Sequence, residues 1–479
     1  MKKSEEGITA KKEKDFSEWY QQLIIKSDLA DYTSVSGCIV FKPVAWAIWE
    51  KIRDEVDKKL KMMNVKNVNF PLFIPEHLLS KEKEHVKGFS PEVAWVTEAG
   101  DTKLSERLAV RPTSEAIMYD SFSRWIRSWR DLPLKYNQWS NVVRWEFKHP
   151  IPFFRTREFI FNEGHTVFAT KKEAEEEGMH IISMYREIME KLLAIPGIIG
   201  KKTDKEKFAG AEYTITIESY LPNGKAIQGP DFHHDGQNFA KAYDIKFLNR
   251  DGKEEYAWQN TWAISTRMLG IMFALHSDDK GLVLPPRVAP NKAVIVPVKF
   301  EIDKKVLQKA KEIFDTLEDY EPILDERLEV TPGYKFNEWE LKGIPLRIEI
   351  GPDDLKKNEV IIFRRDTEKK ESVKISNIKK RVGELLEEIQ DNLFKRAENL
   401  LNKNLDKAES FEDAKKKIND NKLVLVPMKN SQKVEEVLKE KIEGVKTLNI
   451  PLNQPPIKGK KCIISKEQAD YWVYIGRSY

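Results

Sequence analysis

The stretch from residue 142 to residue 166, VVRWEFKHPIPFFRTREFIFNEGHT, carries the residues most able to do chemistry. At the strand period of two, Arg144 and Glu146 share one face before a proline-interrupted loop. After the loop a second run shares one face, and its members are Phe159, Phe161, Glu163 and His165. An ordinary half-buried strand pair keeps apolar groups on one side, so this mixed face indicates a lined pocket. The alternative is an edge hairpin whose charged side chains extend to water.

Familiar phosphate-binding loops are missing from the sequence. GIIGKKT near Gly200 lacks the first glycine of a P-loop, and no GxGxxG opens a βαβ unit. HExxH pairs and GxSxG elbows are also missing. A nucleotide site would therefore consist of side chains on an antiparallel sheet. Arg144, Arg155 and Arg267 could neutralise phosphate charge, with Phe159 under the base. For Arg267, the alternative is a capping or interdomain arginine.

Composition excludes several other classes of protein. The 81 basic and 77 acidic residues leave a net charge of +4, so a polyanion site requires local clustering. Cys38 and Cys462 are the only cysteines, which argues against a disulfide framework and a cysteine-rich metal site. His233 and His234 are more typical of hydrogen-bonded structural histidines than of metal ligands. No stretch is apolar enough to span a bilayer, so we expect a soluble cytoplasmic protein with no membrane contact.

Hydrophobic periodicity predicts the elements that must position these residues. Apolar groups at helical spacing predict helices over 44–63 and 171–195. Short strand patterns from 211 to 265, separated by Asn, Asp and Gly, predict an antiparallel meander rather than βαβ units. The almost wholly apolar segment 266–276 predicts a buried helix. An apolar run around Pro71 predicts a strand at a sheet edge.

We therefore expect an α+β multidomain chain. Residues 1–14 form a disordered leader, and residues 15–288 form the first domain, which ends at a proline-rich connector. Residues 289–392 alternate strand with helix as a small α/β domain, and residues 393–479 form a small α/β C-terminal domain.

Several strings, in order along the chain, resemble prolyl-tRNA synthetase of the archaeal and eukaryotic type. They are RPTSEA, VVRWE with FFRTREFIFNEGHT, DFHHDGQNF, WAISTR, GLVLPPRVAP, GYKFNEWELKGIPLRIEIGP and the terminal GRSY. The resemblance runs from about Asp15 to Tyr479. It implies a class II aminoacyl-tRNA synthetase, whose catalytic domain is an antiparallel sheet flanked by helices, followed by an anticodon-binding domain. The implied reaction activates L-proline with ATP to prolyl-adenylate and transfers the prolyl group to the 3′ end of tRNA(Pro).

The resemblance also implies roles for nucleotide-binding residues. VNFPLFIPE is similar to motif 1, with Pro71 at a dimer contact, which implies a homodimer. In motif 2, Arg144 would bind the α-phosphate, Glu146 the adenine amino group and Phe159 the base. In motif 3, Arg267 would bind the γ-phosphate. The implied catalytic residues are therefore Arg144 and Arg267. The implied ATP contacts are Arg144, Glu146, Arg155, Thr156, Phe159, Gln228, Ser265 and Arg267. Mg²⁺ should bridge the phosphates, with Glu146 and Gln259 as candidate ligands.

The proline pocket that the resemblance implies combines carboxylates for the secondary ammonium with aromatic walls for the pyrrolidine. Phe161 stands where the family often has Trp, which leaves a smaller wall. The implied residues are Thr113, Glu115, Arg144, Phe161, Glu163, His165, Phe208, His233 and Ser265. The substrate carboxylate is already ionised, so adenylate formation requires orientation and electrostatics but no general base.

In the second domain, Glu340 and Arg347 match positions that recognise anticodon guanines in the family. Phe336, Arg364 and Arg365 would add stacking and phosphate contacts. The alternative for each is a solvated surface charge.

The C-terminal region departs from the family pattern. Many relatives hold zinc there with four cysteines, whereas this chain keeps only Cys462, so we expect no zinc. The resemblance implies that Tyr479 folds back toward the active site; the alternative is a surface strand end. The bacterial-type editing insertion is missing between the ATP motifs. Two other functions stay open: a synthetase for another amino acid such as threonine, and a non-catalytic paralogue. The presence of both Arg144 and Arg267 argues against the paralogue.

Overall fold

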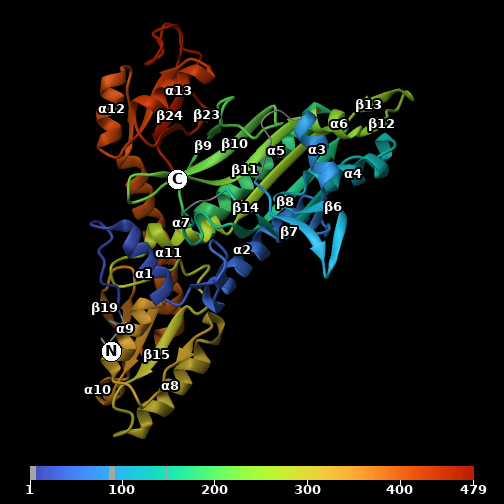
Figure 1. Ribbon diagram of the computed structural model, residues 1–479. Helices are drawn as coiled ribbons and strands as arrows, with labels where there is room; N and C mark the ends of the chain where they lie inside the picture. Colours follow the sequence, from blue (N-terminus) through green and yellow to red (C-terminus); the bar gives the residue numbers. More distant parts are fainter. Residues whose placement is uncertain (1–6, 86–91, 147–148) are drawn as a thin grey trace.

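The computed structural model describes residues 7–85, 92–146 and 149–479. Figure 1 shows a large sheet region coloured green and cyan, an orange unit below it and a red unit near the C-terminus. None of the helices in this described part of the chain combines the length and apolar character that crossing a bilayer requires.

The largest sheet has eight strands in the order β23-β9-β10-β11-β14-β8-β7-β3. Neighbouring strands are antiparallel except for β3 with β7. The strands are β3 (Lys66–Asn67), β7 (Leu134–Val143), β8 (Glu158–Phe168), β9 (Ile198–Lys201), β10 (Tyr213–Tyr220), β11 (Ala226–Gly236), β14 (Trp258–Ser265) and β23 (Ile450–Pro451). The predicted antiparallel sheet is therefore confirmed. Its edge strand β23, however, comes from the far end of the chain.

Helices pack on both faces of this sheet, because side chains alternate along each strand. On one face, Trp262 and Ile264 belong to a core shared with α1 (Phe16–Lys26), α2 (Pro43–Met62), α5 (Lys171–Glu187), a π-helical turn (Ile188–Leu192) and α7 (Arg267–His276). A second core surrounds Tyr119 and Phe122 and involves α3 (Glu76–His85), α4 (Glu115–Trp125) and α6 (Asn238–Tyr243). Helix α7 is buried along almost its whole length, as its apolar sequence predicted.

Smaller pieces complete the first part of the chain. They are β1 (Ala30–Tyr32) paired with β2 (Ile39–Phe41), β12 (Lys246–Leu248) paired with β13 (Glu254–Tyr256), a sheet of β4 (Phe73–Pro75), β6 (Thr102–Val110) and β5 (Trp95–Ala99), and a 3-10 turn (Trp129–Asp131). Strand β4 lies at the edge of its sheet, as predicted. Pro71 itself precedes the strand.

The N-terminal leader requires a correction. Residues 1–6 lie outside the described residues, but residues 9–12 make defined contacts rather than lacking structure. The amide of Lys12 donates to Asp279 at 2.8 Å, and Lys12 Nζ donates to the carbonyl of Ser277 at 2.6 Å. The backbone N–H of Thr9 donates to Gln22 at 2.8 Å. These bonds attach the segment to α1 and to the residues that follow α7.

The second unit is a five-stranded mixed sheet in the order β16-β15-β17-β18-β19. Its strands are β15 (Ala293–Pro297), β16 (Ile323–Leu324), β17 (Leu346–Ile350), β18 (Glu359–Arg364) and β19 (Lys370–Lys374). Its helices are α8 (Lys304–Thr316), α9 (Pro332–Leu341), α10 (Pro352–Lys357) and the start of α11 (Ile378–Lys403), with 3-10 turns at Glu318–Tyr320 and Ile375–Asn377.

The third unit is a four-stranded sheet in the order β20-β21-β24-β22. It contains β20 (Leu405–Lys407), α12 (Phe411–Asn419), β21 (Leu423–Met428), α13 (Gln432–Lys441), β22 (Val445–Thr447) and β24 (Tyr471–Arg477). Helix α11 continues through residues 392 and 393, the expected boundary, so one helix joins the second unit to the third (Figure 1). Cys462 is fully buried in the core of the third unit.

Candidate active site

A cavity of about 270 Å³ opens on the face of the eight-stranded sheet formed by β8, β11 and β14. Most of the residues predicted from the sequence line it: Thr113, Glu115, Arg144, Phe159, Phe161, Glu163, His165, Phe208, Gln228, His233, Ser265 and Arg267. The predicted hairpin is present, since β7 pairs with β8 in a continuous antiparallel register from Leu134↔Val167 to Val143↔Glu158.

Strand register explains why distant segments meet in this cavity. Strand β14 lies between β8 and β11, with Thr261 opposite both His165 and His233. Two residues along, Ala263 lies opposite Glu163. Residues directly opposite on neighbouring strands share a face, so the three strands present their side chains to one space.

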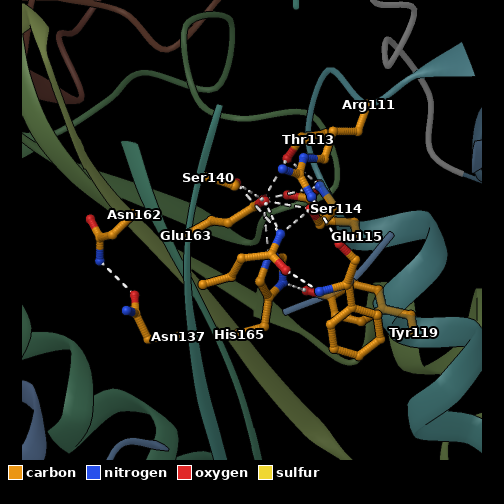
Figure 2. Close-up of polar contacts among 12 residues, drawn as sticks. Arg111, Thr113, Ser114, Glu115, Tyr119, Asn137, Ser140, Asn162, Glu163 and His165 are labelled. Carbon is orange, nitrogen blue, oxygen red and sulfur yellow. Dashed lines mark hydrogen bonds and ion pairs between the residues drawn. The ribbon is translucent and has the colours of Figure 1, made fainter. Parts of the chain in front are cut away.

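Glu163 is the most heavily bonded group of the site (Figure 2). Its carboxylate accepts from the backbone N–H of Ser114 at 3.0 Å and from Gln138 Nε2 at 3.2 Å, and also from the Ser114 hydroxyl. Burial alone would raise the pKa of Glu163, but hydrogen bonds from His165 and Ser114 outweigh it and lower that pKa below its ordinary value. Glu163 is therefore an anion at neutral pH.

Glu115, in contrast, has few partners. It begins α4 and is only 4% exposed, and its carboxylate accepts a hydrogen bond from the Thr113 hydroxyl. The positive end of the helix dipole favours a carboxylate in this first turn. The remaining acceptor capacity of Glu115 is available to a ligand in the cavity.

Aromatic rings form the opposite wall. Phe208 stacks on His233 with ring centroids 4.6 Å apart, and His233 Nδ1 lies 2.8 Å from the Thr214 hydroxyl. Burial lowers the pKa of His233, which keeps the ring neutral despite Asp231 nearby. His234 does not line the cavity. Its Nδ1 lies 2.8 Å from Asn260 Oδ1, which matches the hydrogen-bonded structural histidine that the sequence favoured.

Two arginines also line the cavity. Arg144 Nε donates to the carbonyl of Pro112 at 3.0 Å, and its guanidinium lies 5.3 Å from the centroid of the Phe159 ring. Arg267, the first residue of α7, donates to the carbonyls of Phe154 at 3.2 Å and Gln228 at 3.3 Å. Burial, with the nearby charge of Arg144, lowers the pKa of Arg267. Two cations in one cavity favour an anionic ligand.

Three predicted residues do not line this cavity. Glu146 is exposed in a turn, because β7 ends at Val143 and the strand alternation stops there. Thr156 is buried in the loop before β8. Arg155 lines a neighbouring cavity that also contains Tyr479. The expectation that Arg144 and Glu146 share one strand face is therefore wrong.

Sequence reasoning missed other polar residues of this region, including Ser114, Gln138, Asp231, Asp235 and Thr261. Period-two alternation along β11 and β14 would have placed Asp231 and Thr261 on the cavity face. Asp235 lies at a β-bulge, which breaks that alternation. Gln259, a candidate Mg²⁺ ligand, is fully buried outside the cavity lining, and among the described residues neither its Oε1 nor its Nε2 has a hydrogen-bond partner. In the described ranges 7–85, 92–146 and 149–479, no group of three or more His, Cys, Asp and Glu is placed to hold a metal ion.

The second unit has its own charged and aromatic cluster, made of Phe336, Glu340 and Arg347. Arg347 Nη1 donates to Glu340 at 2.8 Å, and its guanidinium lies 4.2 Å from the ring centroids of both Phe336 and Phe363. Arg364 points away from this cluster and pairs with Asp366 and Glu388. Arg365 is 1% exposed and pairs with Asp278, so the expected surface contact at Arg365 is wrong.

Comparison with known proteins places this architecture in a family. Residues 95–276 match the class II tRNA synthetase core domain of the glycine, histidine, proline, serine and threonine group, and residues 292–385 match an anticodon-binding domain. Residues 411–479 match the prolyl-tRNA synthetase C-terminal domain. A cytoplasmic proline–tRNA ligase of Arabidopsis thaliana is 44% identical over 99% of this chain and 91% of that protein. The chain belongs to the prolyl-tRNA synthetase family.

Bacterial relatives match this prolyl-tRNA synthetase family member equally well. Proline–tRNA ligase 2 of Bacillus thuringiensis (strain Al Hakam) is 45% identical, with the whole length of both chains covered. A proline–tRNA ligase of Oceanobacillus iheyensis is 44% identical over 99% of this chain and 98% of that protein. The expected class II fold, with an anticodon-binding domain and a C-terminal domain, is confirmed.

Proposed function

We propose that this protein activates L-proline with ATP to prolyl-adenylate and transfers the prolyl group to the 3′ end of tRNA(Pro). The observation that carries the proposal is the composition of one cavity lining. The same cavity is lined by carboxylates, by aromatic rings and by the two arginines Arg144 and Arg267. Proline and the triphosphate can thus meet on a single sheet face.

The amino-acid half would work as follows. Glu115, with spare acceptor capacity, takes the secondary ammonium together with the Thr113 hydroxyl. Glu163 holds Ser114 and Gln138 in place and keeps the pocket negative. Phe161, Phe208 and His233 enclose the pyrrolidine, with His165 and Ser265 completing the lining. A pocket with few polar groups in an aromatic wall is typical of small-molecule specificity.

The nucleotide half rests on the two arginines. Arg144 holds the α-phosphate and the substrate carboxylate, Arg267 holds the γ-phosphate, and Phe159 supports the base with Gln228 and Ser265 nearby. Glu146, Arg155 and Thr156 belong to the segment between β7 and β8, from which Glu146 would bind the adenine amino group. Mg²⁺ neutralises charge on the phosphates when bound; the cavity lining includes Asp231 as an oxygen donor, whereas neither Glu146 nor Gln259 lies there.

Adenylate formation needs no proton transfer in this site. The proline carboxylate is ionised at neutral pH and attacks the α-phosphate directly. The bond from the α-phosphorus to the bridging oxygen then breaks, and diphosphate leaves. Arg144 orients both reactants, and the arginines stabilise the charge that develops on the phosphate oxygens. Because both groups are held before reaction, the protein contributes mainly preorganisation.

For the tRNA, Phe336, Glu340 and Arg347 would form one group of anticodon contacts, and Arg364, which pairs with Asp366 and Glu388, would add a separate phosphate contact. Arg347 is already held between two aromatic rings and Glu340, which suits a planar base edge beside them. The catalytic region would span residues 15–288, the anticodon-binding domain residues 289–392 and the C-terminal domain residues 393–479.

Four further properties belong to the proposal. We assign the chain to the archaeal and eukaryotic type, to the cytoplasm and to a homodimer that forms through the segment around Pro71. We also expect the C-terminal domain to need no zinc, because Cys462 is its only cysteine. Metal analysis of the purified protein should find no stoichiometric zinc.

Charging of tRNA tests the whole proposal. The protein should attach proline to a tRNA(Pro) transcript and should lose most of that activity when the anticodon guanines are replaced. The matched control is a tRNA for threonine, which should accept no proline. Charging of tRNA(Pro) with another amino acid in preference to proline would overturn the proposal.

A further inference from the structure

A second cavity of about 140 Å³ lies at the junction between the eight-stranded sheet and the C-terminal domain. It shares Glu206, Gln228 and Arg267 with the first cavity, so the two cavities lie next to each other. Its far wall comes from β22 and the last residues of the chain, through Lys446 and Tyr479.

The C-terminal domain is bonded directly to the catalytic sheet at this junction. Strand β23 pairs with β9 through Ile450↔Lys201 and Pro451↔Gly200. The backbone N–H of Tyr479 donates to the carbonyl of Ala226 at 3.1 Å, and its ring lies 5.1 Å from that of Phe154. These bonds fix Lys446 relative to Arg267.

The second cavity has an excess of positive charge. Its lining includes the cations Arg155, Lys202, Arg267 and Lys446 and the carboxylates Glu206 and Glu218. Both carboxylates are already paired with lysines: Glu218 with Lys202 at 2.5 Å and Glu206 with Lys439 at 2.8 Å. Neither carboxylate is paired with Lys446.

Lys446 is the unusual member of this lining. Its side chain is half-buried, and burial lowers its pKa, with Arg155, Lys202 and Lys439 adding to the effect and Glu206 opposing it. Throughout the part of the chain that the structure describes, no carboxylate lies within ion-pair distance of Lys446 Nζ, and Nζ makes no hydrogen bond. A half-buried ammonium near other cations is costly unless an anion binds there.

We propose that Lys446 binds the phosphate groups of ATP that leave as diphosphate, so that the C-terminal domain contributes a residue to the reaction. The inference rests on the proposed function. When the carboxylate oxygen of proline bonds to the α-phosphorus, the bond from phosphorus to the bridging oxygen breaks and diphosphate departs with that electron pair. Lys446, with Arg267, stabilises the added charge. The charged walls of the cavity fit phosphate groups rather than a base or a pyrrolidine ring.

The test replaces Lys446 by Met, which keeps the length of the side chain and removes the charge. The matched control is Lys433→Met, an exposed lysine on α13 of the same domain. In proline-dependent ATP–diphosphate exchange, Lys446→Met should raise the KM for diphosphate roughly tenfold, the usual effect of losing one charged hydrogen bond. The KM for proline should stay within about twofold, and Lys446→Arg should restore most of the affinity for diphosphate.

Other outcomes separate this inference from the proposed function. An unchanged KM for diphosphate in Lys446→Met overturns the inference, and so does a defect confined to transfer from preformed prolyl-adenylate to tRNA. If the unmodified protein shows no exchange with proline, the proposed function fails instead. In that case, calorimetric titration with diphosphate alone still decides the inference, since Lys446→Met must bind it more weakly than the unmodified protein and Lys433→Met must not.

Discussion

Arg144 is the residue on which both halves of the cavity depend. It is held by the carbonyl of Pro112, lies against Phe159 and lines the same cavity as Arg267. A fixed guanidinium of this kind acts mainly on the charge of the transition state.

Replacement of Arg144 by Ala should therefore reduce adenylate formation by roughly 10²- to 10³-fold or more. The fold should be unaffected, because within the described residues the side chain makes one hydrogen bond, to the carbonyl of Pro112. The measurement is proline-dependent exchange, with circular dichroism as the check on folding. Arg124→Ala, an exposed arginine on α4, is the control. Full exchange activity in Arg144→Ala would show that the phosphate ligand is misassigned.

Asp235 is a buried carboxyl group outside the cavity lining. It is fully buried, and among the described residues neither carboxylate oxygen makes a hydrogen bond. Burial with the charge of Glu115 raises its pKa well above the ordinary value, although the nearby Thr261 hydroxyl opposes this shift. The folded state therefore binds a proton that the unfolded state releases above about pH 4. Folding stability falls as pH rises above that value, up to the pKa of the folded state.

Asp235→Asn removes this proton uptake and should stabilise the protein at pH 7 by on the order of 1 kcal/mol. The gain should shrink as pH falls toward 4, where the wild-type carboxyl is protonated in both states. Urea unfolding at several pH values measures this difference, and Asp251→Asn in an exposed turn is the control. A loss of stability at pH 7 that is independent of pH would contradict the assignment of a protonated Asp235.

At the scale of elements, the junction between α7 and α9 connects the catalytic core to the anticodon-binding domain. Arg365 Nη1 and Nη2 donate to the two oxygens of Asp278 at 2.8 and 2.6 Å, and Arg365 Nε donates to the carbonyl of Glu340 at 2.9 Å. Gly281, with φ +147°, lies so close to Leu341 that an added Cβ would collide with backbone. The chain after α7 is thus closely packed against the end of α9.

Asp278→Ala should cost about 3 kcal/mol of unfolding free energy, because it leaves the guanidinium of Arg365 buried without its partner. The double variant Asp278→Ala with Arg365→Met should be closer to wild type, since no charge is then left buried. Burial would raise the pKa of Asp278, but the hydrogen bonds from Arg365 outweigh it and lower that pKa. The stabilisation is therefore complete above about pH 4 and is lost as pH falls through the pKa of the folded state. Equal costs for the single and double variants would refute the pairing.

At the scale of the whole molecule, exposed apolar residues follow Pro71. Leu72 and Phe73 are 39% and 44% exposed, more than a monomer needs at one short edge strand. They fit the homodimer proposed for the segment around Pro71.

Sedimentation equilibrium should give twice the mass of one chain at micromolar concentration. Leu72→Asp with Phe73→Asp should shift the protein toward the monomer, because a charge would be buried at the contact. Leu328→Asp, on an exposed residue of the second unit, should leave the dimer intact. A monomeric wild-type protein, or a dimer unaffected by the Leu72 and Phe73 changes, would contradict the proposed interface.

The sequence pattern predicted those elements that depend only on neighbouring residues in the chain. The alternation from Phe159 to His165 placed those side chains on one face, and the apolar run after Arg267 indicated a buried helix, because both depend only on period and burial. The placement of Glu146 failed because a strand end, rather than alternation, decides it. The partner of Arg365 and the pairing of β23 could not be predicted, since they join segments far apart in the chain. Asp235 was missed because a bulge interrupts the pattern.

The proposed reaction requires one cavity to bring proline and ATP together. Amino-acid-dependent ATP–diphosphate exchange measures that step alone, without tRNA. With a panel of proline, threonine, alanine, cysteine and histidine, exchange with proline should exceed that with each of the others by at least roughly tenfold. Absent exchange with proline, or stronger exchange with another amino acid, would contradict the account.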